Sequence, residues 1–474
     1  MAESEPVEGN VPPSFQESHP VLASRAQQLA DGKALRLKCP RESHAGWTPP
    51  SDRRDALELM LAAEEGRVAS LLPLRHGRMV RSPFTFYRGA ALTMASDLSS
   101  TPSTGVYVQA CGDAHLCNFG GFATPERRIL FSVNDLDETL PAPWEWDVKR
   151  LATSFVVASR NNGLSETKAG QFAAASVRSY RLSMREFSRM KTLELWYSGI
   201  WVDDLVESID NPTVRKRLQK RLQKEKARSI AHDIFPKLVD VNSDAPIIRD
   251  ELPAIFHFED HLPGSIHESV TDAMKGYTAT LSGPIQSLLS RYQIRDAAIK
   301  VVGVGSVGTM CWVILLMAGE GDPLFLQVKQ ARRSVLEDYA GASPFTNHGQ
   351  RVVNGYRMMQ PASDMFLGWT KGKLRGLHYF VRQLRDIKIS PRTETFGSYE
   401  MEWFATWCGR ALALSHARSG KSGVLTGYMG KSRVFDEAIA SFALAYADQN
   451  EGDHGALDRA VREGKIEAVF EQED

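Results

Sequence analysis

The two segments that decide the fold are Gly112-Asp113-Ala114-His115-Leu116-Cys117-Asn118 and Val133-Asn134-Asp135-Leu136-Asp137. Asp113 stands five residues before Asn118, and Asp135 follows the apolar run 129–133. Carboxylate and amide oxygens are the hard ligands that Mg²⁺ prefers. The spacing predicts a phosphate-transfer site in which Asp113 orients a hydroxyl group while Asn118 and Asp135 hold magnesium, with Asp137 as a further metal ligand.

A glycine-rich segment lies almost two hundred residues downstream and contains Gly303, Gly305, Ser306 and Gly308. A dinucleotide-binding fold would need a helix after these glycines. The run 311–316 is short, partly β-branched and followed by a Gly- and Pro-containing turn, which favours a strand. The next run, 324–329, also predicts a strand and ends in Lys329. This is the kinase arrangement of a glycine loop covering the nucleotide phosphates and a lysine that neutralises them.

The order of these parts is unusual, because in ordinary kinases the glycine loop and the lysine precede the catalytic aspartate. We therefore expect an α+β, protein-kinase-like fold of two lobes that is circularly permuted. Permutation requires only that the original termini lie close together. The C-terminal stretch 403–416 and residues 88–98 would supply the two helices before the catalytic loop, and residues 106–109 the strand that leads into it.

The chain divides into four expected parts. Residues 1–50 are rich in Pro, Ser and Glu and predict a mobile N-terminal extension. Residues 51–290 form a helical lobe with the catalytic and metal-binding loops. Residues 291–388 form a β-rich lobe that cradles the nucleotide, and residues 389–474 form C-terminal helices that pack on the helical lobe.

Composition limits the classes of protein to which this chain can belong. Its 474 residues and 43% hydrophobic content allow a large core. The 57 basic and 57 acidic residues cancel, which argues against specific nucleic-acid or anionic-membrane partners, and the basic strip 215–228 fits a solvated helix. The five cysteines form no metal-binding pattern, and no apolar run reaches the length of a membrane span, so we expect a cytoplasmic protein.

Five segments together resemble a known family: Gly112–Gly120, Asn134–Glu138, Pro143–Arg150, Gly303–Thr309 and Leu326–Lys329. They are similar to the bacterial domain of unknown function 2252, over about residues 50–470. The resemblance implies no substrate. The acidic loops also resemble those of aminoglycoside phosphotransferases, in which Gly-Asp-x-His-x-x-Asn is the catalytic loop and a later Asp binds metal. Met310 and Tyr356 stand where the family pattern has arginine and glutamine.

The acidic residues also allow structural roles. An aspartate such as Asp113 in a glycine-flanked turn can simply form the turn, but its agreement with Asn118, Asp135 and the glycine and lysine cluster favours a site. Asp137 can equally cap a turn. Asp147 either caps the helix that begins near Pro143 or braces the catalytic loop, and we favour bracing.

Three further residues are candidates of second rank. His115 fits a structural hydrogen bond better than a metal. Arg88 either binds phosphate or substrate through its fork of donors, or forms a salt bridge with Asp135 or Glu138. A kinase lysine usually pairs with a helix glutamate, and the nearest candidate for Lys329 is Glu337.

Together these patterns predict a phosphotransferase that uses ATP and Mg²⁺ and acts on an unidentified hydroxyl acceptor, either a small molecule or a protein. Two alternatives remain open. A flipped ATP would allow nucleotidyl transfer to protein side chains, and a non-catalytic regulator could bind nucleotide through the same fold. Retention of every acidic group together with Lys329 argues against the regulator.

Overall fold

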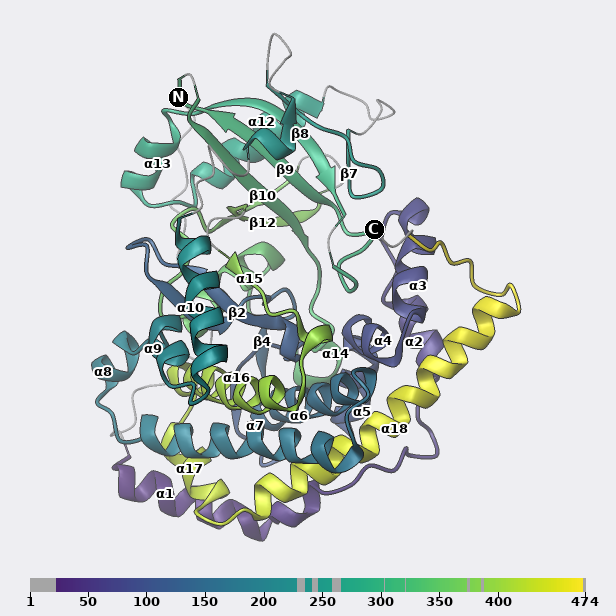
Figure 1. The fold of residues 1–474 in the computed structure, drawn as a ribbon, viewed down its shortest axis with the longest axis vertical. Coiled ribbons are helices and arrows are strands. Elements are labelled where there is room, and N and C mark those ends of the chain that lie inside the picture. Colours follow the sequence, from purple (N-terminus) through teal and green to yellow (C-terminus); the bar gives the residue numbers. More distant parts are fainter. Residues whose placement is uncertain are drawn as a thin grey trace.

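The computed structural model describes residues 23–227, 235–240, 246–257, 266–301, 303–319, 321–372, 376–384 and 388–471. The fold is α+β, as expected from the sequence. A six-stranded sheet occupies the upper part of Figure 1, and the longest helices fill the lower part. The acidic loops come from small sheets between these two parts.

The six-stranded sheet is antiparallel throughout, with the strand order β11-β12-β10-β9-β8-β7. Its strands are β7 (Ile255–Phe256), β8 (Gln293–Lys300), β9 (Cys311–Met317), β10 (Pro323–Ala331), β11 (Gly368–Lys371) and β12 (His378–Gln383). The strands expected at 311–316 and 324–329 are β9 and β10. The glycine-rich segment joins β8 to β9, which are antiparallel neighbours. It is therefore the loop of a β-hairpin, and no helix follows it.

The two acidic loops connect strands of two smaller sheets. The first sheet pairs β1 (Tyr107–Ala110) with β4 (Leu140–Pro143), and the second has the order β13-β2-β3, with β2 (Phe119–Ala123), β3 (Ile129–Val133) and β13 (Lys388–Ile389). One acidic loop leads from β1 to β2 and the other from β3 to β4. A further pair consists of β5 (Val239–Asp240) and β6 (Ile247–Ile248).

Four long helices form most of the main core: α6 (Trp144–Asn161), α7 (Glu166–Phe187), α16 (Ser398–Ser419) and α18 (Val434–Arg462). Pro143 directly precedes α6, where its fixed φ suits the start of a helix. Almost every side chain of α6 is buried, and Trp144 stacks on Tyr180 of α7 with ring centroids 5.8 Å apart. Helix α6 is therefore a central element that can hold polar side chains in fixed positions beneath the acidic loops.

The other helices are shorter. They are α1 (Arg25–Ala34), α2 (Ala56–Ala62), α3 (Leu72–Val80), α4 (Pro83–Gly89), α5 (Ala91–Ser99), α8 (Thr192–Tyr197), α9 (Val202–Glu207), α10 (Pro212–Lys226), α11 (Phe235–Leu238), α12 (Ile266–Thr278), α13 (Gly283–Leu289), α14 (Glu337–Ala340), α15 (His348–Met359) and α17 (Ser422–Met429). Short 3-10 helices lie at Leu35–Leu37, Arg41–His44, Ala69–Leu71, Leu116–Asn118 and Thr393–Thr395.

The expected N-terminal extension is wrong for residues 25–44, whereas residues 1–22 lie outside the described part of the chain. Helix α1 packs closely on α17, where a Cβ atom on Gly32 would lie 2.0 Å from the carbonyl oxygen of Val424. Arg36 donates to the carbonyl oxygens of Gly427 and Tyr428 at the end of α17. The glycine permits this close approach, and the arginine satisfies carbonyl groups that the helix end leaves unpaired.

None of the helices that the structure describes is both long and apolar enough to cross a membrane. All five cysteines lie in the described ranges and are free.

The contact between α7 and α16 provides a test of the packing. A Cβ atom at Gly409 of α16 would lie 2.1 Å from the carbonyl oxygen of Ser176, so Gly409→Ala is expected to lower the free energy of unfolding by about 1–3 kcal/mol. Gly452→Ala in α18 is the matched control, because nothing lies within 4 Å of its added Cβ atom. Helix propensity should make that variant about 0.5–1 kcal/mol more stable. Urea unfolding followed by circular dichroism measures both changes, and a stabilising Gly409→Ala would contradict the packing.

Candidate active site

Asp147, in the first turn of α6, braces the first acidic loop. Its carboxylate accepts hydrogen bonds from the backbone N–H groups of Cys111 at 2.6 Å and Gly112 at 3.0 Å. The Nε2 atom of His416, on α16, lies 3.0 Å from the same carboxylate, and its Nδ1 atom lies 2.9 Å from the Tyr180 hydroxyl. The bracing role predicted for Asp147 is therefore the one that the structure contains.

Asp113 is held by one arginine. Arg150 of α6 donates from Nε at 2.7 Å to the Oδ1 atom of Asp113, and its NH2 atom is 2.5 Å from the same oxygen. Burial raises the pKa of Asp113, and the charge of Arg150 opposes that effect. The Oδ2 atom is 3.8 Å from Nε2 of His115, and Arg150 does not occupy it. Asn118 donates from Nδ2 to the backbone carbonyl of Asp113 at 2.8 Å, which leaves its amide oxygen for a metal ion.

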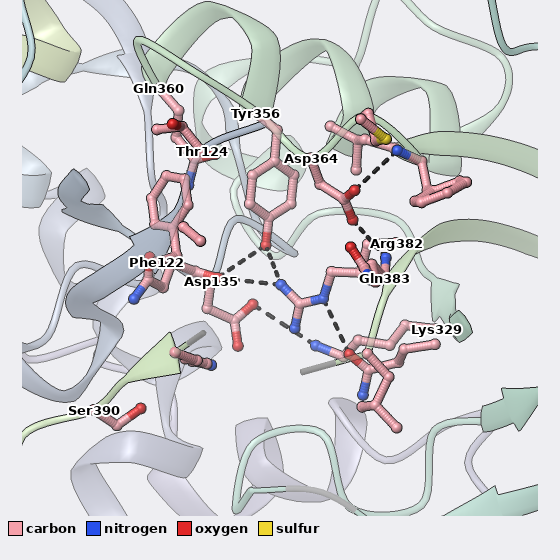
Figure 2. A pocket seen from close by; sticks show the side chains of 18 of the residues that line it. Phe122, Thr124, Asp135, Lys329, Tyr356, Gln360, Asp364, Arg382, Gln383 and Ser390 are labelled. Carbon is pink, nitrogen blue, oxygen red and sulfur yellow. Dashed lines mark hydrogen bonds and ion pairs between the residues drawn. The ribbon is translucent and has the colours of Figure 1, made fainter. Parts of the chain in front are cut away.

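The second acidic loop meets the six-stranded sheet at Lys329 of β10. The Nζ atom of Lys329 lies 2.8 Å from Oδ2 of Asp137 and 3.8 Å from Oδ1 of Asp135. Lys329 is 3% exposed, so its charge depends on these two carboxylates. Figure 2 shows Asp135 and Lys329 directed toward each other across the cavity.

The charges of this cluster shift one another's pKa values. Burial would raise the pKa of Asp135, but Lys329 and Arg382 outweigh it, and the result lies below the usual range. Burial and then the Asp135 carboxylate raise the pKa of Asp137 to about 7. Burial alone would lower the pKa of Lys329, whereas the two aspartates raise it. Asp135 therefore stays charged beside Lys329, whereas Asp137 holds a proton near neutral pH that a bound metal cation would displace.

Arg382 of β12 is a second cation beside Lys329. In the β10–β12 register Arg382 is opposite Gln327, and its Nε atom donates to the Gln327 side chain at 3.0 Å. Its NH1 atom donates to the Tyr356 hydroxyl of α15 at 3.1 Å, and that hydroxyl donates to the backbone carbonyl of Asn134 at 3.0 Å. Figure 2 shows Arg382, Tyr356 and Lys329 converging on one side of the cavity. This face of the sheet therefore presents positive charge next to Asp135.

Hydrogen bonds join the glycine-rich loop to the segment 67–89. Arg78 of α3 donates to the carbonyl of Gly303 at 2.6 Å, and Arg67 donates to the carbonyl of Val307 at 2.6 Å. Gly303 and Gly308 have φ angles of 65° and 83°, in the left-handed region that favours glycine. A Cβ atom at Gly305 would lie 3.2 Å from the carbonyl oxygen of Arg88, so the loop passes close to α4.

Two cavities meet at this place. The larger cavity has a volume of about 920 Å³ and is lined by Lys329, Arg382 and Tyr356, among others. The smaller cavity has a volume of about 510 Å³ and is lined by Asp113, His115 and Asp137, among others. Both are lined by Arg88, Asn118, Asp135, Gly303 and Ser306. The acidic loops and the glycine loop, remote in sequence, therefore form one junction between the two cavities.

The second-rank candidates have distinct positions. Arg88 lines both cavities and forms no ion pair with Asp135 or Glu138. Its Nε atom is buried without a hydrogen-bond partner in the described part of the protein. His115 is 4% exposed, and burial lowers its pKa well below the usual value, so the ring is neutral.

The expected pairing of Glu337 with Lys329 is wrong. Its carboxylate accepts hydrogen bonds from the backbone N–H groups of Ser334 at 3.0 Å and Ser343 at 3.1 Å. The carboxylates that meet Lys329 belong instead to Asp135 and Asp137. Glu337 therefore stabilises its own turn through backbone hydrogen bonds instead of pairing with Lys329.

Three arginines of the site have no role predicted from the sequence. They are Arg150 at Asp113, Arg382 beside Lys329, and Arg351 of α15, which donates to the backbone carbonyls of Asp137, Thr139 and Arg332. One sequence signal was present for Arg382, since it interrupts an apolar strand as Lys329 does. Arg150 and Arg351 lie on helices, where a charged residue carries no such signal.

The residues at the junction fit a magnesium ion. The Oδ1 atoms of Asp135 and Asp137 are buried and have no hydrogen-bond partner among the described residues. No cluster of three or more His, Cys, Asp or Glu side chains suited to a metal is found in the described ranges. Mg²⁺ commonly takes one or two carboxylates and completes its shell with substrate phosphates and water. Asn118, Asp135 and Asp137 match that ligand set.

Comparison with known proteins assigns the chain to a family. Residues 67–460 match the family described as "Uncharacterized protein conserved in bacteria (DUF2252)", and the chain belongs to it. Searches of curated proteins and of solved structures found no match.

Measurements of the free energy of unfolding test the ion pair between Lys329 and Asp137. Lys329→Met should lower the free energy of unfolding by about 1–3 kcal/mol, because Asp135 and Asp137 lose their nearest cation. The double variant Lys329→Met/Asp137→Asn should recover part of this loss, since one of the two stranded carboxylates is then neutral. Urea unfolding of the two single variants and the double variant gives the coupling energy. Losses that simply add would show that the two side chains do not interact.

Proposed function

We propose that this protein is a phosphotransferase that uses ATP and Mg²⁺ and acts on a hydroxyl acceptor, built on a permuted, kinase-like fold of two lobes. The observation that carries the proposal is the junction of the two cavities. Asn118 and Asp135, the glycine loop and Lys329 come from three separate parts of the sequence and line the same cavity. A phosphoryl-transfer site needs these groups together, because catalysis rests on positioning and on neutralising charge.

The lining of the larger cavity combines apolar and charged side chains, as a nucleotide requires. Apolar side chains, namely Leu288, Leu324, Phe366 and Leu384, supply surface for a base. Lys329 and Arg382 supply positive charge for phosphates beside Asp135. A volume of about 920 Å³ is in the range of cavities that bind cofactor-sized ligands.

The smaller cavity would hold the acceptor. The acceptor hydroxyl lies at the free Oδ2 atom of Asp113, attacks the γ-phosphorus of ATP, and gives its proton to the Asp113 carboxylate. The bond between the γ-phosphorus and the β,γ-bridging oxygen breaks, and ADP leaves. Asn118, Asp135 and Asp137 would hold a magnesium ion, which would neutralise phosphate charge. Lys329 and Arg382 bind the phosphate oxygens, and Arg150 fixes the orientation of Asp113.

The contact between α16 and β1 supports the permuted fold. Helix α16 follows the six-stranded sheet in sequence, and its last residue, Ser419, accepts a hydrogen bond from the backbone N–H of Gln109 at 3.0 Å. Strand β1, which contains Gln109, leads directly into the loop with Asp113. The helix after the sheet and the strand before the catalytic loop are thus neighbours in space, as an unpermuted kinase order would make them in sequence.

Nucleotide binding is the first test. Adding ATP and Mg²⁺ together should raise the melting temperature, because a ligand at a hundredfold excess over its Kd stabilises the folded state by about 2.7 kcal/mol. Differential scanning fluorimetry with each purine nucleotide, with and without Mg²⁺, measures the effect. Absence of a shift with every nucleotide would remove the proposal.

Substitutions of Asp113 and Asp135 should have different effects on nucleotide binding and turnover. Asp113→Asn should keep the thermal shift with Mg²⁺ and ATP but lower turnover by roughly 10²-fold or more, as loss of a general base does. Asp135→Asn should lose both, because it removes a metal ligand. Turnover is followed as ADP formed, and equal effects of the two changes on binding would show that the roles are assigned wrongly.

Product mass distinguishes the remaining alternatives. Phosphoryl transfer adds a phosphate group to the acceptor and releases ADP, whereas nucleotidyl transfer to a protein side chain adds a nucleoside monophosphate and releases pyrophosphate. Binding of Mg²⁺ and ATP without either product would indicate a non-catalytic regulator.

A further inference from the structure

The smaller cavity is lined by six arginines: Arg54, Arg67, Arg75, Arg88, Arg332 and Arg333. Acidic residues line it as well, but cations outside the lining contact three of them: Arg150 binds Asp113, and Lys329 lies beside Asp135 and Asp137. Arg333 pairs with Asp338, and Arg75 pairs with Glu64 outside the lining. The positive charge available to a ligand in the smaller cavity therefore comes from the other four arginines.

Four of these arginines, Arg54, Arg67, Arg88 and Arg332, form no ion pair with a carboxylate among the described residues. The Nε atom of Arg67 and the NH1 atom of Arg332 both donate to the carbonyl oxygen of Ala63, at 3.0 Å and 2.8 Å. Arg332 also donates to the carbonyl of Glu65, at 2.6 Å. Two guanidinium groups thus converge on one backbone oxygen. Burial, together with the charges of Arg75 and Arg332, lowers the pKa of Arg67 to about 9, as expected where cations repel one another.

Of these six arginines, Arg88 is the one that also lines the larger cavity. Its charge opposes the raised pKa of Asp113. Its Nε atom is buried without a hydrogen-bond partner in the described ranges. A buried guanidinium donor without a partner costs free energy, and an anion in the cavity would supply the missing acceptor.

We propose that the smaller cavity binds an anionic small molecule, bearing a phosphate or a carboxylate, and that this molecule is the hydroxyl acceptor. The inference rests on the proposed function for the acceptor role. The anionic group lies against Arg88 and Arg332, and the hydroxyl lies at Oδ2 of Asp113. A volume of about 510 Å³ suits a small molecule.

The test is calorimetric titration of the full chain, first saturated with Mg²⁺ and a non-hydrolysable ATP analogue so that the larger cavity is filled. Inorganic phosphate, glycerol 3-phosphate and glycerate are the anionic probes, and glycerol is the neutral control. The anions should bind and glycerol should not. Comparison of the Kd values of the phosphate probes and of glycerate shows whether the cavity prefers a phosphate or a carboxylate.

Substitutions of single arginines identify the side chains that bind the phosphate probe. Arg88→Gln and Arg332→Gln should each weaken phosphate binding by about tenfold or more, because each removes charge-assisted donors. Arg217→Gln, at a side chain 67% exposed on α10, is the matched control and should bind as the wild type does. Asp113→Asn should bind phosphate several times more tightly, since it removes a negative charge from the cavity and frees Arg150.

Three outcomes would overturn the inference. Phosphate could bind equally well to Arg88→Gln, Arg332→Gln and the wild type, or glycerol could bind as tightly as glycerol 3-phosphate. The ATP analogue could also abolish phosphate binding, in which case the arginines bind the nucleotide phosphates.

Nucleotide binding without anion binding would contradict this inference but not the proposed function. Anion binding that depends on Arg88 without any nucleotide binding would instead remove the phosphotransferase and keep only the anion site.

Discussion

The contact between Lys329 and Asp137 is the constraint on which the site depends. It joins the six-stranded sheet to the second acidic loop at 2.8 Å, and Lys329 is almost completely buried. Arg351 strengthens the same junction by binding backbone carbonyls on both sides, those of Asp137 and Thr139 in the loop and that of Arg332 after β10. Separating the sheet from the loop would leave buried charges without partners, which costs several kcal/mol. The six-stranded sheet and the acidic loops therefore keep each other in position.

Charge is distributed so that the two cavities differ. Arg150 and Lys329 approach the aspartates from outside the smaller cavity, whereas Arg67, Arg88 and Arg332 face it. The acidic groups consequently concentrate at the junction, where the proposed reaction would require a metal ion. Positive charge remains on both sides, with Lys329 and Arg382 on one side and the arginines on the other. Such a layout favours anionic ligands in both cavities and a cation between them.

Local patterns in the sequence predicted local structure well. The strands at 311–316 and 324–329 and the lack of a helix directly after the glycine-rich segment follow from patterns of a few residues. Long-range partners could not be predicted in this way. Asp137 and Lys329 are 192 residues apart, and the Glu337 pairing failed because proximity in sequence was its only support. The packing of α1 on α17 depends on Gly32 facing a carbonyl almost four hundred residues away, and no local pattern contains that information.

Arg150 bears on how Asp113 would act in the proposed reaction. A carboxylate bound by a guanidinium is a weaker base than a free one, although burial raises the pKa of Asp113 in the opposite direction. In a loose phosphoryl-transfer transition state the bond to the leaving group is largely broken before the acceptor oxygen bonds, so little proton transfer is needed early. Arg150 fixes Oδ1 and leaves Oδ2 for the hydroxyl, which suits a group that orients the acceptor and takes its proton late. The same arginine lies one helical turn from Asp147, so α6 sets both the position of the loop and the direction of its reactive carboxylate.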